Sequence, residues 1–266
     1  MNINLINLIN INAQIWINIA VAILVLIFGY IMGSIPTSVW IGKIFYHQDP
    51  RNYGSHNAGG TNAGRLWGKR VGFTIIVLDM IKTVAPIWIV WAILTFIPMF
   101  EGKPILVNAT DFYNEAAKST YLIQWPVYWL APVGCIIGHC FPLFANFKGG
   151  KGAAGFMGTI CFTSWYFGLV PGIIYFGILK WKKYVSLTAI LISIISSLFA
   201  WLWVILVATK AIPAQYANIS MYGPTLVCDW VCATCITLMS VIVILRHHEN
   251  IKRIITGTER KITWMK

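Results

Sequence analysis

Two lysines and three glycines alternate in the segment Lys148-Gly149-Gly150-Lys151-Gly152, which lies between two apolar stretches. No carboxylate stands in residues 138–154 to neutralise the lysines. Glycine lets backbone N–H groups approach a ligand, and successive exposed N–H groups form an anion-binding concavity. The segment therefore predicts a phosphate site, and the simpler alternative is a solvated loop whose charge only sets membrane topology. It is not a Walker A loop, because Gly152 follows Lys151 where that motif needs Ser or Thr.

A second polar stretch, residues 54–65, is dense in glycines, hydroxyls and amides and ends in Arg65. Hydroxyl and amide groups donate to phosphate oxygens, and a guanidinium can bind phosphate with two parallel hydrogen bonds. A flexible linker is the simpler interpretation. Two Asn residues, a Thr and an Arg this close to an apolar stretch favour a binding role instead.

The third polar stretch is the basic tail from Arg246 onward. If the last apolar helix continues into it, His247 and Asn250 are three residues apart and share a face. Three apolar positions form a stripe typical of an interfacial segment, namely Ile251, Ile254 and Ile255. Four further basic residues are interpreted as an anchor on anionic lipid, namely Lys252, Arg253, Arg260 and Lys261.

One acid and one base lie inside an apolar stretch, Asp79 and Lys82, one helical turn apart. Each charge alone at the centre of a membrane helix would cost about 2.5–3.5 kcal/mol, so the two should face the bundle interior and pair. We favour a structural clamp that supports the site over direct substrate contact.

The composition places these stretches in a membrane protein. The chain has 266 residues, of which 58% are hydrophobic and 11% charged, which is too apolar for a soluble domain. Its net charge is +12, and the Lys and Arg residues lie between the apolar segments and not in one long polar stretch. This distribution excludes a soluble nucleic-acid binder. It indicates contact with anionic lipid and with anionic substrates. The six cysteines lie in or beside apolar segments, and the sequence predicts neither a metal nor a cofactor.

The apolar stretches predict an all-α, polytopic membrane helix bundle. Residues 1–14 alternate Asn with Ile and Leu and read as a low-complexity segment, followed by one membrane domain over residues 15–266. At 1.5 Å per residue, five of the stretches are long enough to cross about 30 Å of hydrocarbon. They are residues 15–45 with a kink near Pro36, 71–99, 125–147, 185–208 and 224–245.

The distribution of Lys and Arg predicts the orientation. The loops around residues 46–70, 148–151 and 180–183 and the carboxyl-terminal tail are basic, whereas the loops at 100–124 and 209–223 are nearly neutral. All basic loops share one side if the stretch 153–180, interrupted by Pro171-Gly172, crosses twice. That gives seven transmembrane helices with the amino terminus outside and the carboxyl terminus in the cytoplasm. Five spans plus a re-entrant pair is the alternative.

Three motifs in this order resemble the bacterial membrane glycerol-3-phosphate acyltransferases that use acyl phosphate. The first, Gly-Ser-x-Asn-x-Gly-x-Thr-Asn-x-x-Arg, is Gly54 to Arg65, and the second runs from Gly138 to Gly152. The third is Arg-His-Arg-x-Asn-Ile, here Arg246 to Ile251, although His248 replaces its second arginine. Thr83 also stands where Gly is usual, and the loop at 100–124 is longer than is typical. The resemblance extends over nearly the whole chain from Gly33 onward.

The resemblance implies transfer of a fatty acyl group from acyl phosphate to the sn-1 hydroxyl of glycerol 3-phosphate, the first acylation step of phospholipid synthesis. It places the active site at the cytoplasmic face of the cell membrane, with membrane lipids around it, and leaves the oligomeric state open. The implied catalytic residues are Ser55, Arg65, Lys151, His247 and Asn250. The implied phosphate-binding residues are Asn57, Gly59, Thr61, Asn62, Lys148, Gly149, Gly150 and Gly152. The supporting residues are Asp79, Lys82 and His139, and a structural role for His139 is as compatible as a catalytic one.

The sequence leaves the general base open. Soluble-type acyltransferases pair a His with an Asp five positions later, and no His in this chain has that partner. Either a phosphoryl oxygen of the donor or His247 could accept the hydroxyl proton, and we favour the phosphate. Two rival functions are a transporter of organic phosphates, which would show internal repeats, and a membrane anchor, which would not need residues 54–65.

Overall fold

The computed structural model describes residues 11–96, 105–108, 111–112, 114–213, 216 and 226–262. Within these residues the chain is helical, with one isolated β-bridge between Leu106 and Ile123. The first α-helices are α2 (Ile11–Gly33), α3 (Thr37–Phe45), α4 (Gly60–Trp67), α5 (Lys69–Phe96), α6 (Glu115–Lys118) and α7 (Leu130–Cys140). The remaining α-helices are α8 (Ala153–Thr163), α9 (Trp165–Lys182), α10 (Val185–Ala208), α11 (Trp230–Arg246) and α12 (His248–Ile255). Short 3-10 helices lie at Pro50–Asn52, Val127–Trp129 and Leu143–Ala145.

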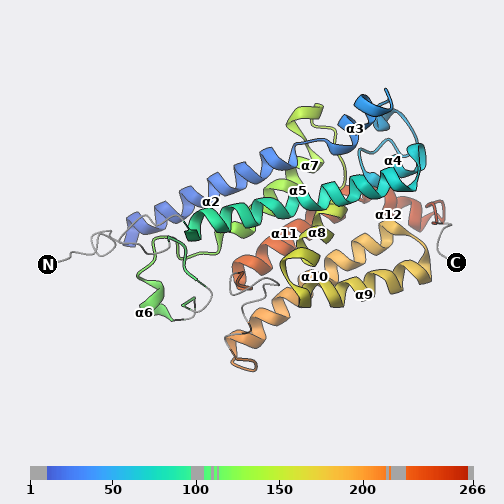
Figure 1. Ribbon diagram of the computed structural model, residues 1–266. Helices are drawn as coiled ribbons and strands as arrows, with labels where there is room; N and C mark the ends of the chain where they lie inside the picture. The colour runs from blue at the N-terminus through green and yellow to red at the C-terminus, as the bar shows by residue number, and fades with distance from the viewer. Residues whose placement is uncertain are drawn as a thin grey trace.

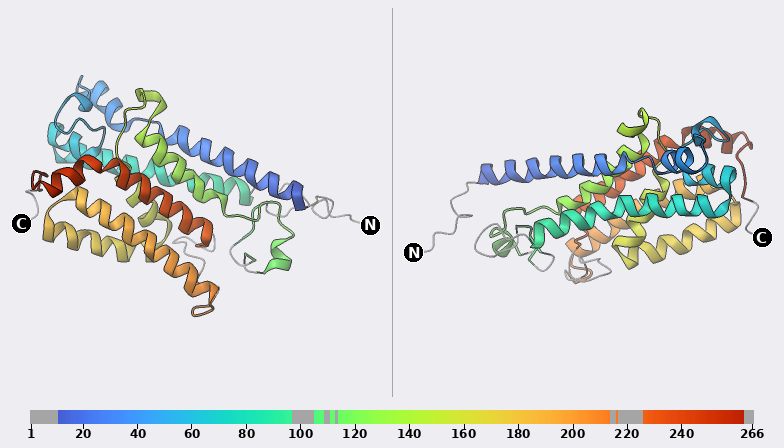
Figure 2. Two further views of the ribbon diagram at one scale, coloured as in Figure 1. Left: turned by 180° about the vertical axis from the view of Figure 1, so that it is seen from behind. Right: turned by 45° about the horizontal axis from the view of Figure 1, so that its top comes forward.

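The long helices run side by side as one bundle (Figures 1 and 2). Four of the described segments are long and apolar enough to cross a membrane, namely Asn12–Phe45, Lys69–Phe96, Val127–Ala145 and Val185–Ala208. A fifth is formed if α11 and α12, which meet at an angle of 58°, count as one bent span. The five full spans expected from hydropathy thus all correspond to helical segments of the structure.

The kink expected near Pro36 is present. The helix of the first span ends at Gly33 and resumes as α3 at Thr37, with Pro36 immediately before it. Proline lacks the N–H that a continuous helix needs, and its ring disfavours helical geometry in the preceding residue. The break turns the chain toward the first polar loop.

Glycines bring α2 and α7 into close contact. Gly29 and Gly33 on α2 face the carbonyl oxygens of Ala131 and Cys135 so closely that a Cβ atom would collide with them. Gly134 and Gly138 on α7 approach the α2 backbone in the same way. Each pair has the Gly-x-x-x-Gly spacing that lets membrane helices pack backbone to backbone. This contact fixes the end of α7, from which the lysine-glycine loop leaves.

The stretch 153–180 forms two helices, but the break is not at Pro171-Gly172. Helix α8 ends at Thr163 and α9 begins at Trp165 with Ser164 as its cap, whereas Pro171 lies inside α9. Membrane helices tolerate such a proline because neighbouring groups satisfy the freed backbone. With 11 residues, α8 is only about 16 Å long at 1.5 Å per residue, roughly half of the hydrocarbon thickness.

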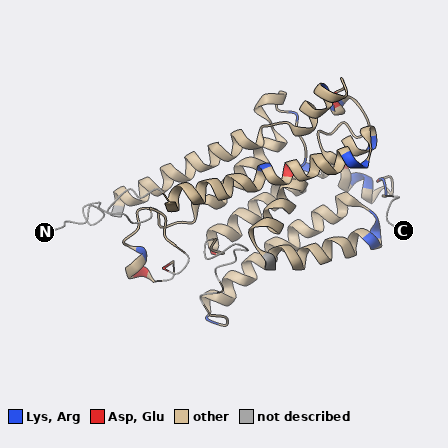
Figure 3. Ribbon diagram, in the orientation of Figure 1, with Lys and Arg blue, Asp and Glu red and all other residues tan. Residues whose placement is uncertain are grey.

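Basic residues gather at one end of the bundle (Figure 3). The polar loop after α3, the loop before α8, the end of α9 and the tail after α12 all lie there (Figure 1). Contacts confirm the arrangement: the N–H of Ile262 donates to the Lys183 carbonyl at 2.8 Å, and the Lys261 ammonium lies 5.4 Å from the centre of the Tyr184 ring. The charged segments separated in sequence are therefore neighbours in space.

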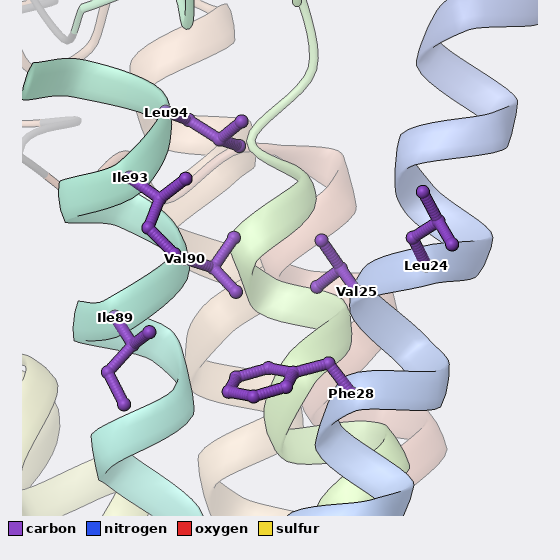
Figure 4. A pocket seen from close by; sticks show the side chains of 7 residues that line it. All are labelled: Leu24, Val25, Phe28, Ile89, Val90, Ile93 and Leu94. Atoms are coloured by element: carbon purple, nitrogen blue, oxygen red, sulfur yellow. The ribbon is translucent and has the colours of Figure 1, made fainter. Parts of the chain in front are cut away.

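A cavity of about 230 Å³, open to the surface of the bundle, lies between α2 and α5 (Figure 4). It is lined only by apolar side chains, those of Leu24, Val25, Phe28, Ile89, Val90, Ile93 and Leu94. Such a surface suits a hydrocarbon chain, and its lining has no polar or ionisable side chain that could act in a reaction. The candidate catalytic groups lie at the charged end of the bundle.

Candidate active site

The lysine-glycine loop and the tail meet at Lys151 and Asn250. The Lys151 ammonium donates a hydrogen bond to Oδ1 of Asn250, which is buried at the start of α12. The pKa of Lys151 is lowered to about 8, chiefly by burial and also by the charges of Arg253, Arg246 and Arg65, while Glu259 opposes the shift. The ammonium of Lys151 thus lies among cations from two other segments.

Arg65 brings the first polar loop into the same cluster. Burial lowers its pKa, as do the neighbouring charges of Arg260 and Arg253, while Glu259 raises it. Arg65 sits in the last turn of α4, which is held on α5 by a glycine contact: a Cβ on Gly72 would come within 2.6 Å of the Gly64 Cα atom. The three polar stretches, whose basic loops were predicted to share one side of the membrane, therefore lie close together.

Glu259 is the carboxylate at the centre of these cations. Its Oε1 accepts hydrogen bonds from Asn250 Nδ2 and from Ser186 Oγ, each at 2.7 Å, and its Oε2 accepts one from Arg253 Nε at 2.8 Å. Burial alone would raise the pKa of Glu259, but these hydrogen bonds outweigh it and hold the pKa below its usual value. Arg253, interpreted from the sequence as part of a lipid anchor, is thus engaged at the site.

His247 lies at the bend between α11 and α12, only 4% exposed. Its Nδ1 lies 2.7 Å from the Val243 carbonyl oxygen. Because a carbonyl only accepts, Nδ1 carries the proton, and Nε2 of the neutral ring is left as an acceptor. The condition that the last helix continues into the tail is met only with a bend of 58° at this point, and His247 and Asn250 are both buried at the junction.

The glycines of the central loop serve packing. The N–H groups of Gly149 and Gly150 donate to the carbonyl oxygens of Cys140 and His139 at 3.2 and 3.0 Å. A Cβ at Gly149 would collide with the His139 carbonyl, and one at Gly150 with the imidazole of His139. The expected row of free N–H groups is therefore wrong at these two positions, because both are already bonded to the end of α7.

The N-terminus of α8 offers N–H groups instead. Helix α8 begins at Ala153, two residues after Lys151, and Gly152 precedes it with a φ of +78° and no side-chain cap. The first N–H groups of a helix have no partner within it and favour anions. Lys151 and this helix start thus supply a cation and backbone donors side by side, as a phosphate site requires.

Two arginines hold the central loop in place. Arg246 donates from Nε and Nη2 to the Gly150 carbonyl at 3.3 and 3.2 Å. Arg51 donates from Nη1 to the carbonyls of Ala145 and Lys148 at 2.8 and 3.1 Å, while its Nη2 pairs with Asp49 at 2.7 Å. Arg51 therefore fastens the central loop to the segment after α3, and Arg246 fastens it to the end of α11.

Asn62 organises the first polar loop. Its Oδ1 accepts from the N–H of Ser55 at 2.9 Å, and its Nδ2 lies within 2.8–3.1 Å of the carbonyls of Pro50, Tyr53 and Asn57. Gly59 caps α4, where its carbonyl accepts from the N–H of Asn62 and of Ala63. Asn62 is 1% exposed, so its amide is committed to the loop itself.

The other predicted residues have different surroundings. Ser55 is exposed and Asn57 half-buried on the loop before α4, and Thr61 is exposed in the first turn of α4. Lys148 is exposed and linked to Arg51 through its carbonyl. His248 is also exposed, with its Nε2 3.2 Å from Glu249. Their roles toward phosphate stay predictions.

The predicted clamp is present beneath the site. Asp79 Oδ1 pairs with the Lys82 ammonium at 2.8 Å and accepts from Thr37 Oγ1 at 3.0 Å. Lys82 also donates to the Ile35 carbonyl at 2.8 Å, and His139 Nδ1 lies 3.6 Å from Asp79. The buried pair therefore joins the break after α2, helix α5 and the end of α7, where Gly150 is bonded.

Sequence reasoning did not single out four polar residues of this region, namely Arg51, Ser186, Arg246 and Glu259, as parts of the site. Arg51 was counted only as positive charge in a loop, and Arg246 was the first residue of the third motif without a role of its own. Of these four residues, only Glu259 could have been found from the sequence. It is the one carboxylate in residues 250–266 of a strongly basic tail. An isolated acid among so many bases needs a partner, and its partners lie in α10 and α12.

Comparison with known proteins identifies the architecture. A family described as glycerol-3-phosphate acyltransferase matches residues 23–257, which is most of the chain. The chain belongs to this family. Its members are integral membrane enzymes of phospholipid biosynthesis, in agreement with the resemblance of the three motifs and with the helical bundle.

Similar proteins cover nearly the full length of the chain. A glycerol-3-phosphate acyltransferase from Listeria welshimeri is 35% identical over 244 residues, 91% of this chain and 98% of the relative. One from Staphylococcus haemolyticus is 31% identical over 247 residues, with the same coverage. The crystal structure of PlsY (YgiH), an integral membrane glycerol 3-phosphate acyltransferase, in its glycerol 3-phosphate form has a TM-score of 0.65 and 28% identity, covering 91% of this chain and 96% of that one. Its lysophosphatidic acid form has a TM-score of 0.62 and 27% identity, covering 91% and 95%.

Proposed function

We propose that the chain transfers a fatty acyl group from acyl phosphate to the sn-1 hydroxyl of glycerol 3-phosphate, releasing lysophosphatidic acid and inorganic phosphate. The observation that carries the proposal is the meeting of Arg65, Lys151 and Asn250 from three distant segments. Both substrates are phosphate monoesters or anhydrides with two negative charges, and this cluster has more cations than carboxylates. The charge of the site fits a pair of phosphates.

In the transfer, the hydroxyl oxygen attacks the acyl carbonyl carbon and forms the new ester bond. The bond between that carbon and the phosphate oxygen breaks, and inorganic phosphate leaves with the hydroxyl proton. Cations aimed at the phosphates stabilise the charge that develops on the leaving group and on the carbonyl oxygen. Holding the two reactants together supplies a further large part of the acceleration, because oriented groups reach effective molarities of about 10⁵–10⁸ M.

The proton can take two routes in this site. The leaving phosphate can accept it directly, which is the route that we favour. His247 is the alternative base, because Nδ1 is held by the Val243 carbonyl and Nε2 is free of that bond. Among the described residues, no carboxylate bonds to His247 as an aspartate would in a His-Asp pair. His139 does lie beside an aspartate, but that residue, Asp79, is already paired with Lys82.

We further infer that the amino end lies outside and the site lies at the cytoplasmic face of the cell membrane. The clustering of basic loops at one end supports this orientation (Figure 3). The same orientation follows from either topology. Helices α8 and α9 can be two of seven spans or a re-entrant pair beside five spans, and in both cases the chain returns to the same face of the membrane. The length of α8 favours the re-entrant pair.

The test uses the purified full chain in lipid nanodiscs with labelled glycerol 3-phosphate and either acyl phosphate or acyl coenzyme A. We expect lysophosphatidic acid, acylated at the sn-1 position, from acyl phosphate alone. Substitution of Lys151→Ala should lower kcat by about 10²–10³, the usual effect of losing one preorganised donor. The matched control is Lys43→Ala, which removes an exposed charge from the same end and should leave kcat unchanged.

Three outcomes would contradict the proposal. Product from acyl coenzyme A but not from acyl phosphate would assign a different donor. Accumulation of glycerol 3-phosphate in proteoliposomes without lysophosphatidic acid would indicate a transporter. Full activity of the Lys151→Ala variant would move the chemistry away from this cluster.

A further inference from the structure

The tail after α12 folds back over the site and carries Glu259 with it. Gly257 has a φ of +71°, and the N–H groups of Thr258 and Glu259 donate to the Arg253 carbonyl at 2.8 and 3.1 Å. The Ile262 N–H then reaches the Lys183 carbonyl at 2.8 Å. This path leaves the Glu259 side chain only 9% exposed. Its carboxylate is therefore placed by the backbone on both sides of it.

Glu259 determines which end of the Asn250 amide faces Lys151. A carboxylate can only accept hydrogen bonds and an ammonium can only donate them. Because Asn250 Nδ2 donates to Glu259 at 2.7 Å, Oδ1 must point away from the carboxylate, and it accepts from the Lys151 ammonium. The three groups form a chain in which each hydrogen bond has one allowed direction.

Glu259 also fixes the neighbours of this chain. Its Oε1 accepts from Ser186 on α10 and its Oε2 accepts from Arg253 on α12, so both oxygens are occupied. A carboxylate with three partners inside the protein is an orienting group, because at most one of its acceptor sites, on Oε2, is left over. It acts on the reaction through the residues that it holds.

We propose that Glu259 is a positioning residue of the phosphate site, which orients the Asn250 amide so that Lys151 presents its remaining protons to a substrate phosphate. The inference rests on the proposed function. An ammonium has three donors, and the bond to Asn250 uses one of them. With the amide turned the other way, its NH₂ group would face the ammonium, and Lys151 would lose its anchor.

The test compares Glu259→Ala, which removes the acceptor, with Glu259→Gln, which keeps an acceptor oxygen but removes the charge. The matched control is Glu249→Gln, the same change at an exposed carboxylate of α12. We expect Glu259→Ala to raise the Kd for glycerol 3-phosphate about tenfold, the effect of losing a charge-assisted hydrogen bond. Glu259→Gln should recover part of the affinity, and Glu249→Gln should match the wild type.

Coupling to Asn250 separates positioning from general stabilisation. In an Asn250→Ala background, the further substitution Glu259→Ala should raise the Kd by less than about twofold, because the amide that Glu259 orients is absent. A second readout is the pH at which binding weakens through Lys151: both Glu259 variants should shift it downward, because Glu259 raises the pKa of that lysine. A tail that only stabilises the fold would leave this pH unchanged.

The inference is overturned if Glu259→Ala binds as the wild type does, if its effect is unchanged in the Asn250→Ala background, or if the pH of weakening does not move. Should Glu259→Ala fail to fold, the Glu259→Gln variant decides by the same coupling and pH readouts. The wild-type acyl-phosphate assay is run alongside. Absence of lysophosphatidic acid there contradicts the proposed function, whereas wild-type activity with unaltered Glu259 variants contradicts this inference alone.

Discussion

Two polar clusters of the molecule use charge in opposite ways. In the clamp, Asp79 faces one lysine and lies beside His139, with Thr37 completing its contacts. In the site, Glu259 is surrounded by cations from several segments: Arg65, Lys151, Arg246, Arg253 and Arg260. The clamp is balanced within itself, whereas the site carries an excess of positive charge.

The difference agrees with the proposed roles, in which one cluster supports the fold and the other binds phosphate. A buried ion pair that satisfies its own charge has no demand for a ligand and holds segments in place. A cluster of like charges repels itself until an anion enters, so we expect an anion such as phosphate to be favoured there. The clamp lies directly under the loop that carries Lys151, through His139 and Gly150. One cluster therefore positions the other.

The largest expected effect is from breaking the clamp. Substitution of Asp79→Ala leaves Lys82 buried without its counter-ion, which should cost about 3–5 kcal/mol of stability. Thermal unfolding in detergent, followed by tryptophan fluorescence, measures the loss. The double variant Asp79→Leu/Lys82→Met removes both charges and should be more stable than the single one.

The contrast with the site sharpens this prediction. Lys151→Ala removes a charge from a repulsive cluster, so it should leave stability unchanged or slightly raised while activity falls. If Asp79→Ala unfolds at the wild-type temperature, or if Lys151→Ala is the less stable of the two, the assignment of support to one cluster and binding to the other is wrong.

The next effect concerns pH and only the site. With its pKa lowered to about 8, Lys151 is half deprotonated near that pH in the free protein and becomes mostly neutral above it. A bound phosphate dianion favours the protonated form, so binding takes up a proton there, and affinity should fall by up to about tenfold per pH unit above pH 8. Phosphate monoesters are dianions above pH of about 6, so a Kd series from pH 7 to 9.5 isolates the lysine.

Lys151→Arg is the control for the fall in affinity above pH 8. A guanidinium stays protonated throughout the series, so the variant should bind with an affinity that does not depend on pH in this range. If the affinity of Lys151→Arg falls above pH 8 in the same way, another group titrates there, and the argument that Lys151 binds the phosphate is removed.

Much of this comparison was accessible from the sequence. The pairing of Asp79 with Lys82 followed from the cost of lone charges in an apolar helix, and α10 coincides with the predicted span 185–208. The meeting of residues 54–65, 148–152 and 246–250 followed from placing every basic loop on one side. Each of these rests on a strong local signal, either charge or hydropathy.

Other features depend on tertiary contacts that no local pattern carries. The chain breaks at Ser164 and continues as a helix through Pro171, because neighbouring helices decide where a membrane helix can bend. Gly149 and Gly150 looked like anion-binding glycines, yet their N–H groups are bonded to the end of α7. Glu259 joins the site only through a fold-back of the tail, which hydropathy cannot show.

The smallest expected effect tests how far the site extends along α12. His248 stands where the family pattern has Arg, and its side chain is 62% exposed and adjacent to Glu249. Substitution of His248→Arg restores the family residue, but an exposed guanidinium beside Glu249 should pair there, changing the KM for glycerol 3-phosphate by less than about twofold. Lys252→Ala, one turn further along the same exposed side, is the matched control and should also have little effect. A tenfold fall in KM with His248→Arg would show instead that a cation at position 248 reaches the phosphate, and the cationic cluster would then include the first turn of α12.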